Sequence, residues 1–270
     1  MIIINDLLVD WEDRWKYVDD SSLLETLTRN QESILQTTLD GINQWCVRNN
    51  MSLSPRQCKE IFICFLKNNP DFPPLTIDEQ PIDWLVKSAK LLGVVFNDDL
   101  TRNDRVTYIV KKSLKRLYML GILKRARADT KTLITMYVTY VRPILEYCAQ
   151  VWHYNIPEYL SKDIERIQLK AMKIIDPSLS YNDALAVFDI PTYFILKAEQ
   201  LCLTLFRKKV LPQSSPLSEL IQTIKTHSYN LRVPDKLVPP RCRTSSFRNY
   251  FIPSSVIQYN EHLNWFLSLK

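Results

Sequence analysis

TRNDRVTYIVKKSLKRLYMLGILKRAR, residues Thr101–Arg127, is the stretch that most directly dictates the architecture of this chain. Its apolar residues recur mostly at spacings of three and four, which is typical of one face of an α-helix. Nine basic residues fall largely between them, against one acid, Asp104. The pattern therefore predicts a long helix over residues 103–126 with one apolar face and one cationic face.

The net charge of the chain is concentrated in this segment. The 270 residues carry 35 Lys and Arg against 29 Asp and Glu, a formal charge of +6, whereas the segment alone carries +8 and the remainder −2. A solvated helix face would explain such a run. A contact surface for a nucleic-acid backbone also explains it, because so many unpaired positive charges on one element are costly without a polyanion nearby. The candidate nucleic-acid-binding residues are Arg105, Lys111, Lys112, Lys115 and Arg116.

Helical patterns continue after this segment. Helices are predicted over residues 130–152, 158–175, 181–188 and 192–210. Pro143 is expected to kink or restart the first of these, since proline removes a helix hydrogen bond. A linker rich in Pro and Ser occupies residues 211–216, and a second basic cluster follows over residues 225–248, where prolines favour extended backbone.

The chain before residue 101 has a β character instead. A hairpin is predicted over residues 14–27 and a helix over 31–49. Short strands are expected at 51–53, 60–66, 75–77, 82–85 and 91–96, with a loop at 68–74. The shift in pattern near residue 100 predicts an α+β protein with a domain boundary there, between a β-containing half and an α-helical half.

Glycine and cysteine usage excludes several kinds of site. The chain has three glycines, Gly41, Gly93 and Gly121, and no two of them are close. A Rossmann turn or a P-loop needs clustered glycines, so neither is present. The six cysteines form no C-x-x-C pair and have no histidine at zinc spacing, which favours free thiols in a reducing compartment. The N-terminus lacks the features of a signal peptide, so an intracellular location, in the nucleus or the cytoplasm, is expected.

The sequence Tyr17-Val18-Asp19-Asp20 contains the candidate catalytic residues, Asp19 and Asp20. A short strand that ends in adjacent carboxylates at a hairpin turn projects both above the sheet, where they repel unless a divalent cation neutralises them. Mg²⁺ prefers such oxygen ligands, and two-metal phosphoryl-transfer sites use them. Asp-Asp is also a common turn dipeptide, as Asp98-Asp99 illustrates.

The order of several blocks resembles the reverse transcriptases of non-LTR (LINE-type, jockey-like) retrotransposons. Trp15–Asp20 resembles palm motif C of that family, and Met51–Pro55 after a helix resembles its motif D. Leu91–Val94 is similar to the palm hairpin near the primer terminus. Val141–Cys148, closed by Val151-Trp152, is similar to the thumb helices.

This resemblance implies a partial reverse-transcriptase palm, made of a small antiparallel sheet with a helix. That palm would span residues 1–100, followed by a helical thumb over residues 101–176 and a helical or extended C-terminal region over residues 177–270. It implies that Asp19 and Asp20 are Mg²⁺ ligands and that Leu92, Gly93 and Val94 form the primer-grip region. The implied partner is an RNA/DNA template–primer duplex, with no small-molecule cofactor and no membrane.

The chain also departs from the family pattern. In the family, the fingers and palm motifs A and B precede motif C, and motif A supplies another metal-binding Asp. Here Ile2–Leu7 resembles the segment directly after motif B. The family's motif D usually has a lysine two positions after its proline, as general acid, whereas this chain has Gln57 there. Lys59 is the candidate general acid only if the register shifts, because proton transfer requires hydrogen-bond reach.

Two classes of function follow from these observations. The first is a fragment of a Mg²⁺-dependent RNA-directed DNA polymerase, expected to be inactive alone because motifs A and B and the fingers are absent from these 270 residues. The alternative is a non-catalytic nucleic-acid-binding remnant, or a genomic relic without selected function.

Overall fold

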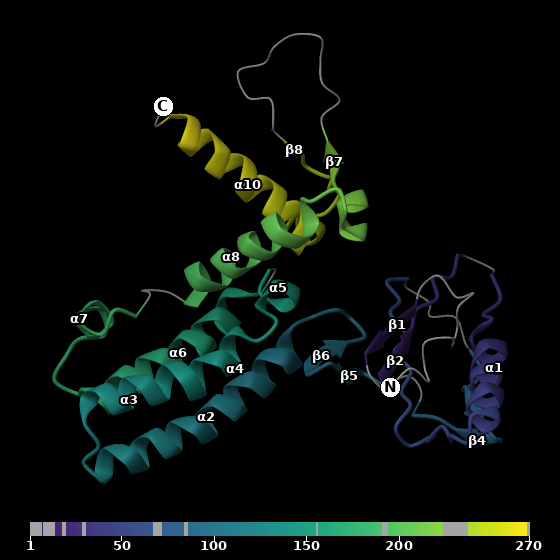
Figure 1. Ribbon diagram of the computed structural model, residues 1–270, viewed down its shortest axis with the longest axis horizontal. Helices are drawn as coiled ribbons and strands as arrows, with labels where there is room; N and C mark the ends of the chain where they lie inside the picture. Colours follow the sequence, from purple (N-terminus) through teal and green to yellow (C-terminus); the bar gives the residue numbers. More distant parts are fainter. Residues whose placement is uncertain are drawn as a thin grey trace. The chain divides into compact units, whose positions relative to one another are not determined.

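The computed structural model describes residues 7, 14–17, 20–28, 31–66, 72–83, 86–154, 156–190, 194–223 and 237–268. The chain divides into two compact units. The N-terminal unit comprises Met1–Leu92 and Phe96–Leu100, and the helical unit comprises Gly93–Val95 and Thr101–Lys270. Over the described residues, the first holds short strands and one helix, and the second is mostly helical (Figure 1), so the α+β class is confirmed in general terms. The further subdivision at residue 176 stays a prediction.

The N-terminal unit is built around one helix. Strands β1 (Arg14–Tyr17) and β2 (Asp20–Leu23) pair antiparallel, as the sequence predicted. Helix α1 (Leu35–Arg48) buries Ile42 and Cys46 in a small cluster with Leu7.

Two further strands, β3 (Thr76–Ile77) and β4 (Gln80–Pro81), form a short hairpin. Gln36 ties α1 to β3, because its amide Nε2 donates to Thr76 O at 3.0 Å and its Oε1 accepts from Thr76 N at 2.9 Å. The Gln36 side chain thus makes both hydrogen bonds that an adjacent strand would make to the backbone of Thr76.

Several strand predictions in this unit are wrong. Residues 51–53 and 60–66 are irregular, and near them the structure describes a single parallel bridge between Lys59 and Asp83. A short apolar run becomes a strand only where an adjacent strand pairs with its backbone N–H and C=O groups. The single bridge does not provide such a series of paired residues. The strand expected at 82–85 is displaced to β4, while residues 84–85 and part of the 68–74 loop lie outside the described residues. The run 91–96 is a hairpin, β5 (Ser88–Leu91) and β6 (Val94–Asn97).

The helical unit follows the predicted periodicity closely. Helix α6 matches its predicted bounds, and α2 ends one residue early. The α-helices are α2 (Asn103–Arg125), α3 (Thr130–Met136), α4 (Arg142–Glu146), α5 (Ala149–Trp152), α6 (Glu158–Ile175), α7 (Tyr181–Val187), α8 (Phe194–Leu205), α9 (Ser245–Arg248) and α10 (Phe251–Ser268). Within the second basic cluster, residues 224–236 lie outside the described residues, and α9 is a short helix where extended backbone was expected.

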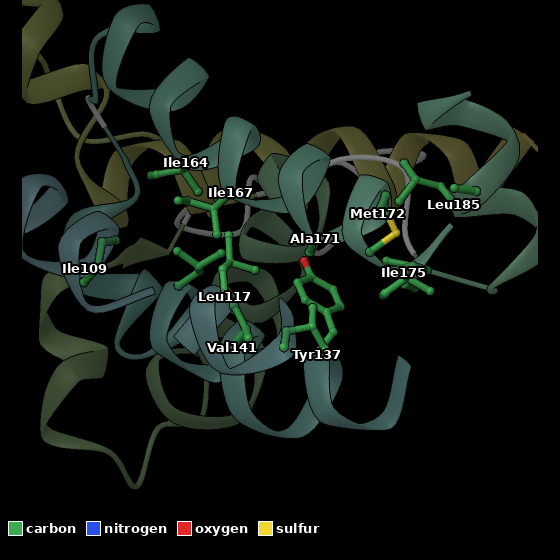
Figure 2. Close-up of a cluster of buried hydrophobic side chains, with 14 of the residues drawn as sticks. Ile109, Leu117, Tyr137, Val141, Ile164, Ile167, Ala171, Met172, Ile175 and Leu185 are labelled. Atoms are coloured by element: carbon green, nitrogen blue, oxygen red, sulfur yellow. The ribbon is translucent and has the colours of Figure 1, made fainter. Parts of the chain in front are cut away.

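The main core lies between α2, α3, α4 and α6. Side chains such as Leu117, Val141 and Ile167 point into it from three different helices (Figure 2). The core also contains a buried hydrogen bond, in which Tyr137 Oη donates to Gln168 Oε1 at 3.2 Å. A smaller core of Phe206, Val210, Leu237 and Val256 joins the π-helical turn Phe206–Val210, which follows α8, to α10.

The predicted helix 130–152 is interrupted, as Pro143 led us to expect. Helix α3 passes into a π-helical turn at Tyr137–Val141, and α4 restarts with Pro143 in its first turn. Proline has no N–H to donate, so the backbone before it widens instead of continuing the α-helical ladder. Cys148, at a φ of +54°, then turns the chain into α5.

Two cationic side chains of α2 hold other segments by their backbone carbonyls. Lys124 Nζ donates to Ile175 O at the C-terminus of α6, at 2.7 Å. Arg105 is 1% exposed and donates from Nη1 to Gly93 O at 2.8 Å and from Nη2 to Tyr147 O at 2.9 Å. Its Cζ lies 5.6 Å from the Trp152 ring centre, and burial lowers the pKa of the guanidinium. Carbonyl dipoles and ring faces thus stabilise this buried charge.

Replacing Arg105 should destabilise the helical unit. Arg105→Met leaves Gly93 O without this donor, so we expect a loss of about 3 kcal/mol in the free energy of unfolding, measured by urea titration with circular dichroism. Arg105→Lys keeps the charge but not the two-pronged geometry, and it should restore only part of the loss. The matched control Lys111→Met removes an exposed cation of the same helix and should change stability by less than about 0.5 kcal/mol. Equal stability of the Arg105→Met and Lys111→Met variants would contradict this role.

The stability of the helical unit should also fall in mild acid because of His153. Burial lowers the pKa of His153 from 6.5 to about 4 in the folded chain. Between these two pH values, His153 binds a proton in the unfolded chain but not in the folded chain. The contribution of His153 to the free energy of unfolding is therefore complete above pH 6.5 and declines as the pH falls towards 4. The expected loss at pH 5 is about 2 kcal/mol. Unfolding titrations at pH 7.5 and pH 5 check this, and His153→Gln, which cannot titrate, should lose less over the same interval; identical losses would refute it.

Candidate nucleic-acid interface

The β1–β2 hairpin carries the predicted carboxylates. The register pairs Tyr17 with Asp20, so Asp20 is the first residue of β2 and is exposed to solvent. Asp19 lies outside the described residues. Trp15 and Tyr17, which alternate to the same face of β1, are 57% and 63% exposed. Among its described residues, the hairpin therefore presents the Asp20 carboxylate beside the turn and two exposed aromatic side chains on one face of β1.

The described residues do not complete a metal site around Asp20. A carboxylate oxygen suits Mg²⁺, which takes about six oxygen ligands. Over the described ranges, however, no group of three or more His, Cys, Asp or Glu side chains lies close enough together to hold a metal ion. The Mg²⁺ prediction rests on Asp19 and Asp20 in the sequence.

Lys59, the candidate general acid, is exposed and lies at the bridge to Asp83. In the part of the chain that the structure describes, no ion pair joins Lys59 to a carboxylate. Its role in proton transfer stays a prediction.

Of the predicted primer-grip residues, Leu92 and Gly93 form the tight turn between β5 and β6, and Val94 is the first residue of β6. Leu92 and Gly93 have φ values of +45° and +83°. Two-residue hairpin turns with a positive φ at both central residues match the right-handed twist of the flanking strands. A Cβ atom at Gly93 would lie 3.1 Å from Cε1 of Tyr147, so glycine is needed for both backbone and space. Val94 is buried, whereas Leu92 is exposed. The turn is also held in place by Arg105, which donates a hydrogen bond to the Gly93 carbonyl.

The exposed face of α2 carries three of the predicted phosphate contacts. Lys111, Lys112 and Lys115 are exposed, and none forms an ion pair with a carboxylate among the described residues. Lys112 Nζ lies 5.9 Å from the ring centre of Tyr108. The opposite face of α2 packs into the main core, so the three ammonium groups stand on a helix that is held in place.

Arg116 differs from these lysines. It is half-buried, and its Cζ lies 3.8 Å from the ring centre of Tyr140, which places the guanidinium on the aromatic face. The guanidinium is therefore positioned by Tyr140 at the edge of the exposed face.

Arg105 requires a correction. The sequence grouped it with the phosphate contacts, but the structure places it in the interior, where two carbonyl oxygens take its donors. A guanidinium with 1% exposure has no access to a nucleic-acid backbone. The signal was present in the periodicity, because Arg105 precedes the buried Ile109 by four residues and so lies on the apolar side of α2.

A groove between α2 and α6 was missed by sequence reasoning. It is a shallow, open hollow of about 610 Å³, lined by Leu114, Leu117, Tyr118, Gly121 and Arg125 from α2 and by Leu169, Lys170, Lys173 and Ile174 from α6. The available signal was Gly121, a glycine in the interior of an otherwise strong helical pattern.

Among the residues that the structure describes, no helix is both long and apolar enough to span a bilayer.

The chain is distantly similar to a reverse transcriptase of a mobile element. It is 28% identical over 165 residues to the RNA-directed DNA polymerase from mobile element jockey of Drosophila funebris. The alignment covers 59% of this chain and 17% of that polymerase. No family model matches the chain, and no solved structure does so either. The relation to reverse transcriptases that the sequence blocks indicated is thus supported by a distant, partial similarity.

Proposed function

We propose that this chain is the C-terminal part of a retrotransposon RNA-directed DNA polymerase, and that its helical unit holds the RNA/DNA template–primer duplex through the exposed face of α2. The observation that carries the proposal is the set Lys111, Lys112 and Lys115, three exposed cations on a helix whose other face is buried. The similarity to the jockey polymerase supports nucleic acid as the partner, since such an enzyme copies an RNA template.

The arrangement suits a duplex backbone better than a base sequence. Ammonium groups are point charges that attract phosphate without reading base edges, so binding should tolerate any sequence. Counterions released from the phosphates make such binding steeply dependent on salt. Arg116 on Tyr140 adds a planar group that can donate to a phosphate oxygen from a fixed position.

The other regions take roles that follow from the same relation. The N-terminal unit would be the end of the palm, with the β1–β2 hairpin as its motif C and Asp19 and Asp20 as Mg²⁺ ligands. When bound, Mg²⁺ would supply charge neutralisation for nucleotidyl transfer. Leu92, Gly93 and Val94 would form the primer grip, and the helices from α2 onwards the thumb. Arg105 then positions the primer grip on the thumb by holding the Gly93 carbonyl.

Charge reversal on α2 tests the duplex contact. In the triple variant Lys111→Glu, Lys112→Glu, Lys115→Glu, affinity for a labelled RNA/DNA duplex should fall by about ten-fold or more, and the slope of log K against log salt should shrink by about 2 to 3. Fluorescence anisotropy over a salt series measures both quantities. The matched control Lys131→Glu, Lys208→Glu, Lys209→Glu changes the net charge equally at exposed sites elsewhere and should retain most of the affinity. If both variants bind alike, the face of α2 is not the contact.

A primer-extension assay tests the expected inactivity of the 270 residues alone. With template–primer, deoxynucleotides and Mg²⁺, the purified chain should give no extension product, because one carboxylate pair does not assemble a two-metal site. Asp19→Asn should leave this result unchanged. A competent reverse transcriptase in the same buffer provides the positive control. Extension by the chain that Asp19→Asn abolishes would overturn the proposal that it is inactive alone.

A further inference from the structure

We propose that the α2–α6 groove, defined by its nine lining residues, is a docking site for an acidic amphipathic helix of a partner protein. It differs from the duplex-binding face, since Lys111, Lys112 and Lys115 do not line it. The inference does not rest on the proposed polymerase function.

The floor of the groove is apolar and open. Leu114 and Tyr118 are 38% and 66% exposed, although both face the same groove as the half-buried Leu169 and Ile174. Single exposed apolar residues are ordinary on a protein surface. Here Leu114 and Tyr118 lie together with Leu169 and Ile174 in one open hollow, where a single partner would cover them at once.

The rim of the groove has one sign of charge. Arg125, Lys170 and Lys173 are exposed lining residues, and the lining contains no acid. None of the three forms an ion pair among the described residues. An occupant with carboxylates beside an apolar stripe would therefore match both the rim and the floor.

Gly121 keeps the floor clear. A glycine in a helix interior costs about 0.5–1 kcal/mol relative to alanine. The packing of this chain does not require it, because a Cβ atom at residue 121 would have no heavy atom within 4 Å. An approaching partner backbone would use the space that a side chain at this position would fill.

The dimensions fit a helix. From Leu114 to Arg125 the α2 wall is about 16 Å long at 1.5 Å per residue, which equals three helical turns of a partner. Apolar side chains at positions i, i+3, i+4 and i+7 of that partner would fill the floor, as in other helix-in-groove complexes. A single-stranded nucleic acid fits less well, since bases stack on aromatic rings and the floor has one, Tyr118, among aliphatic side chains.

The test uses a labelled synthetic peptide of about 14 residues with Leu at i, i+3, i+4 and i+7 and Glu at most other positions. Fluorescence anisotropy with the full chain should show saturable binding. Gly121→Trp, which fills the groove, should weaken it by about ten-fold or more, whereas Gly121→Ala, which adds a single Cβ atom, should weaken it less. Circular dichroism and thermal unfolding of both variants establish that each is folded.

Charge complementarity is tested with the pair Lys170→Glu, Lys173→Glu. This variant should bind the peptide more weakly than Lys208→Glu, Lys209→Glu, which makes the same charge change away from the groove. A peptide with Gln in place of Glu should also bind more weakly to the unmodified chain. The proposal is overturned if the folded Gly121→Trp variant binds the peptide normally, or if the two charge variants bind alike. It is also overturned if a single-stranded oligonucleotide binds in the groove and the peptide does not.

Discussion

The buried guanidinium of Arg105 is the interaction on which the arrangement of the helical unit most depends. It joins three segments that are distant in sequence, the Gly93 turn, the start of α2, and the bend after α4 at Tyr147. Trp152 Nε1 donates to the same Tyr147 carbonyl at 2.9 Å, so that oxygen is held from two sides. Because burying a charge is costly without hydrogen-bond acceptors, the two carbonyl acceptors of Arg105 make the three segments constrain one another. Gly93 belongs to this set, since the Tyr147 ring occupies the space of a side chain.

The same helix therefore uses its cations in two physically different ways. Arg105, in the interior, and Lys124, exposed near the end of the helix, serve as donors to backbone carbonyls, where hydrogen-bond geometry decides their contribution. Outside, Lys111 and Lys115 remain hydrated charges whose effect is a field that attracts polyanions. A count of basic residues does not separate these two populations, whereas the position of each around the helix axis does.

The helices were predictable because their apolar spacing is long and regular. The bounds of α6 and the restart at Pro143 followed from local rules, as did the pairing of β1 with β2. The strands expected at 51–53 and 60–66 failed because a strand depends on a partner that local sequence does not name. The left-handed Cys148, the contact between Gly93 and Tyr147, and the α2–α6 groove arise only from tertiary packing. For the candidate site, the exposed lysines of α2 were predictable and the interior position of Arg105 was available in the spacing.

The hydrogen bond from Lys124 to the Ile175 carbonyl restricts the movement of α2 along α6. It joins the last turn of α2 to the last residue of α6, while the main core fixes the remainder of both helices side by side. Sliding one helix past the other by a turn would move Lys124 about 5.4 Å from its acceptor and leave a helix-end carbonyl without its donor. Sliding of α2 along α6 is therefore opposed at this end by a hydrogen bond as well as by the packed core.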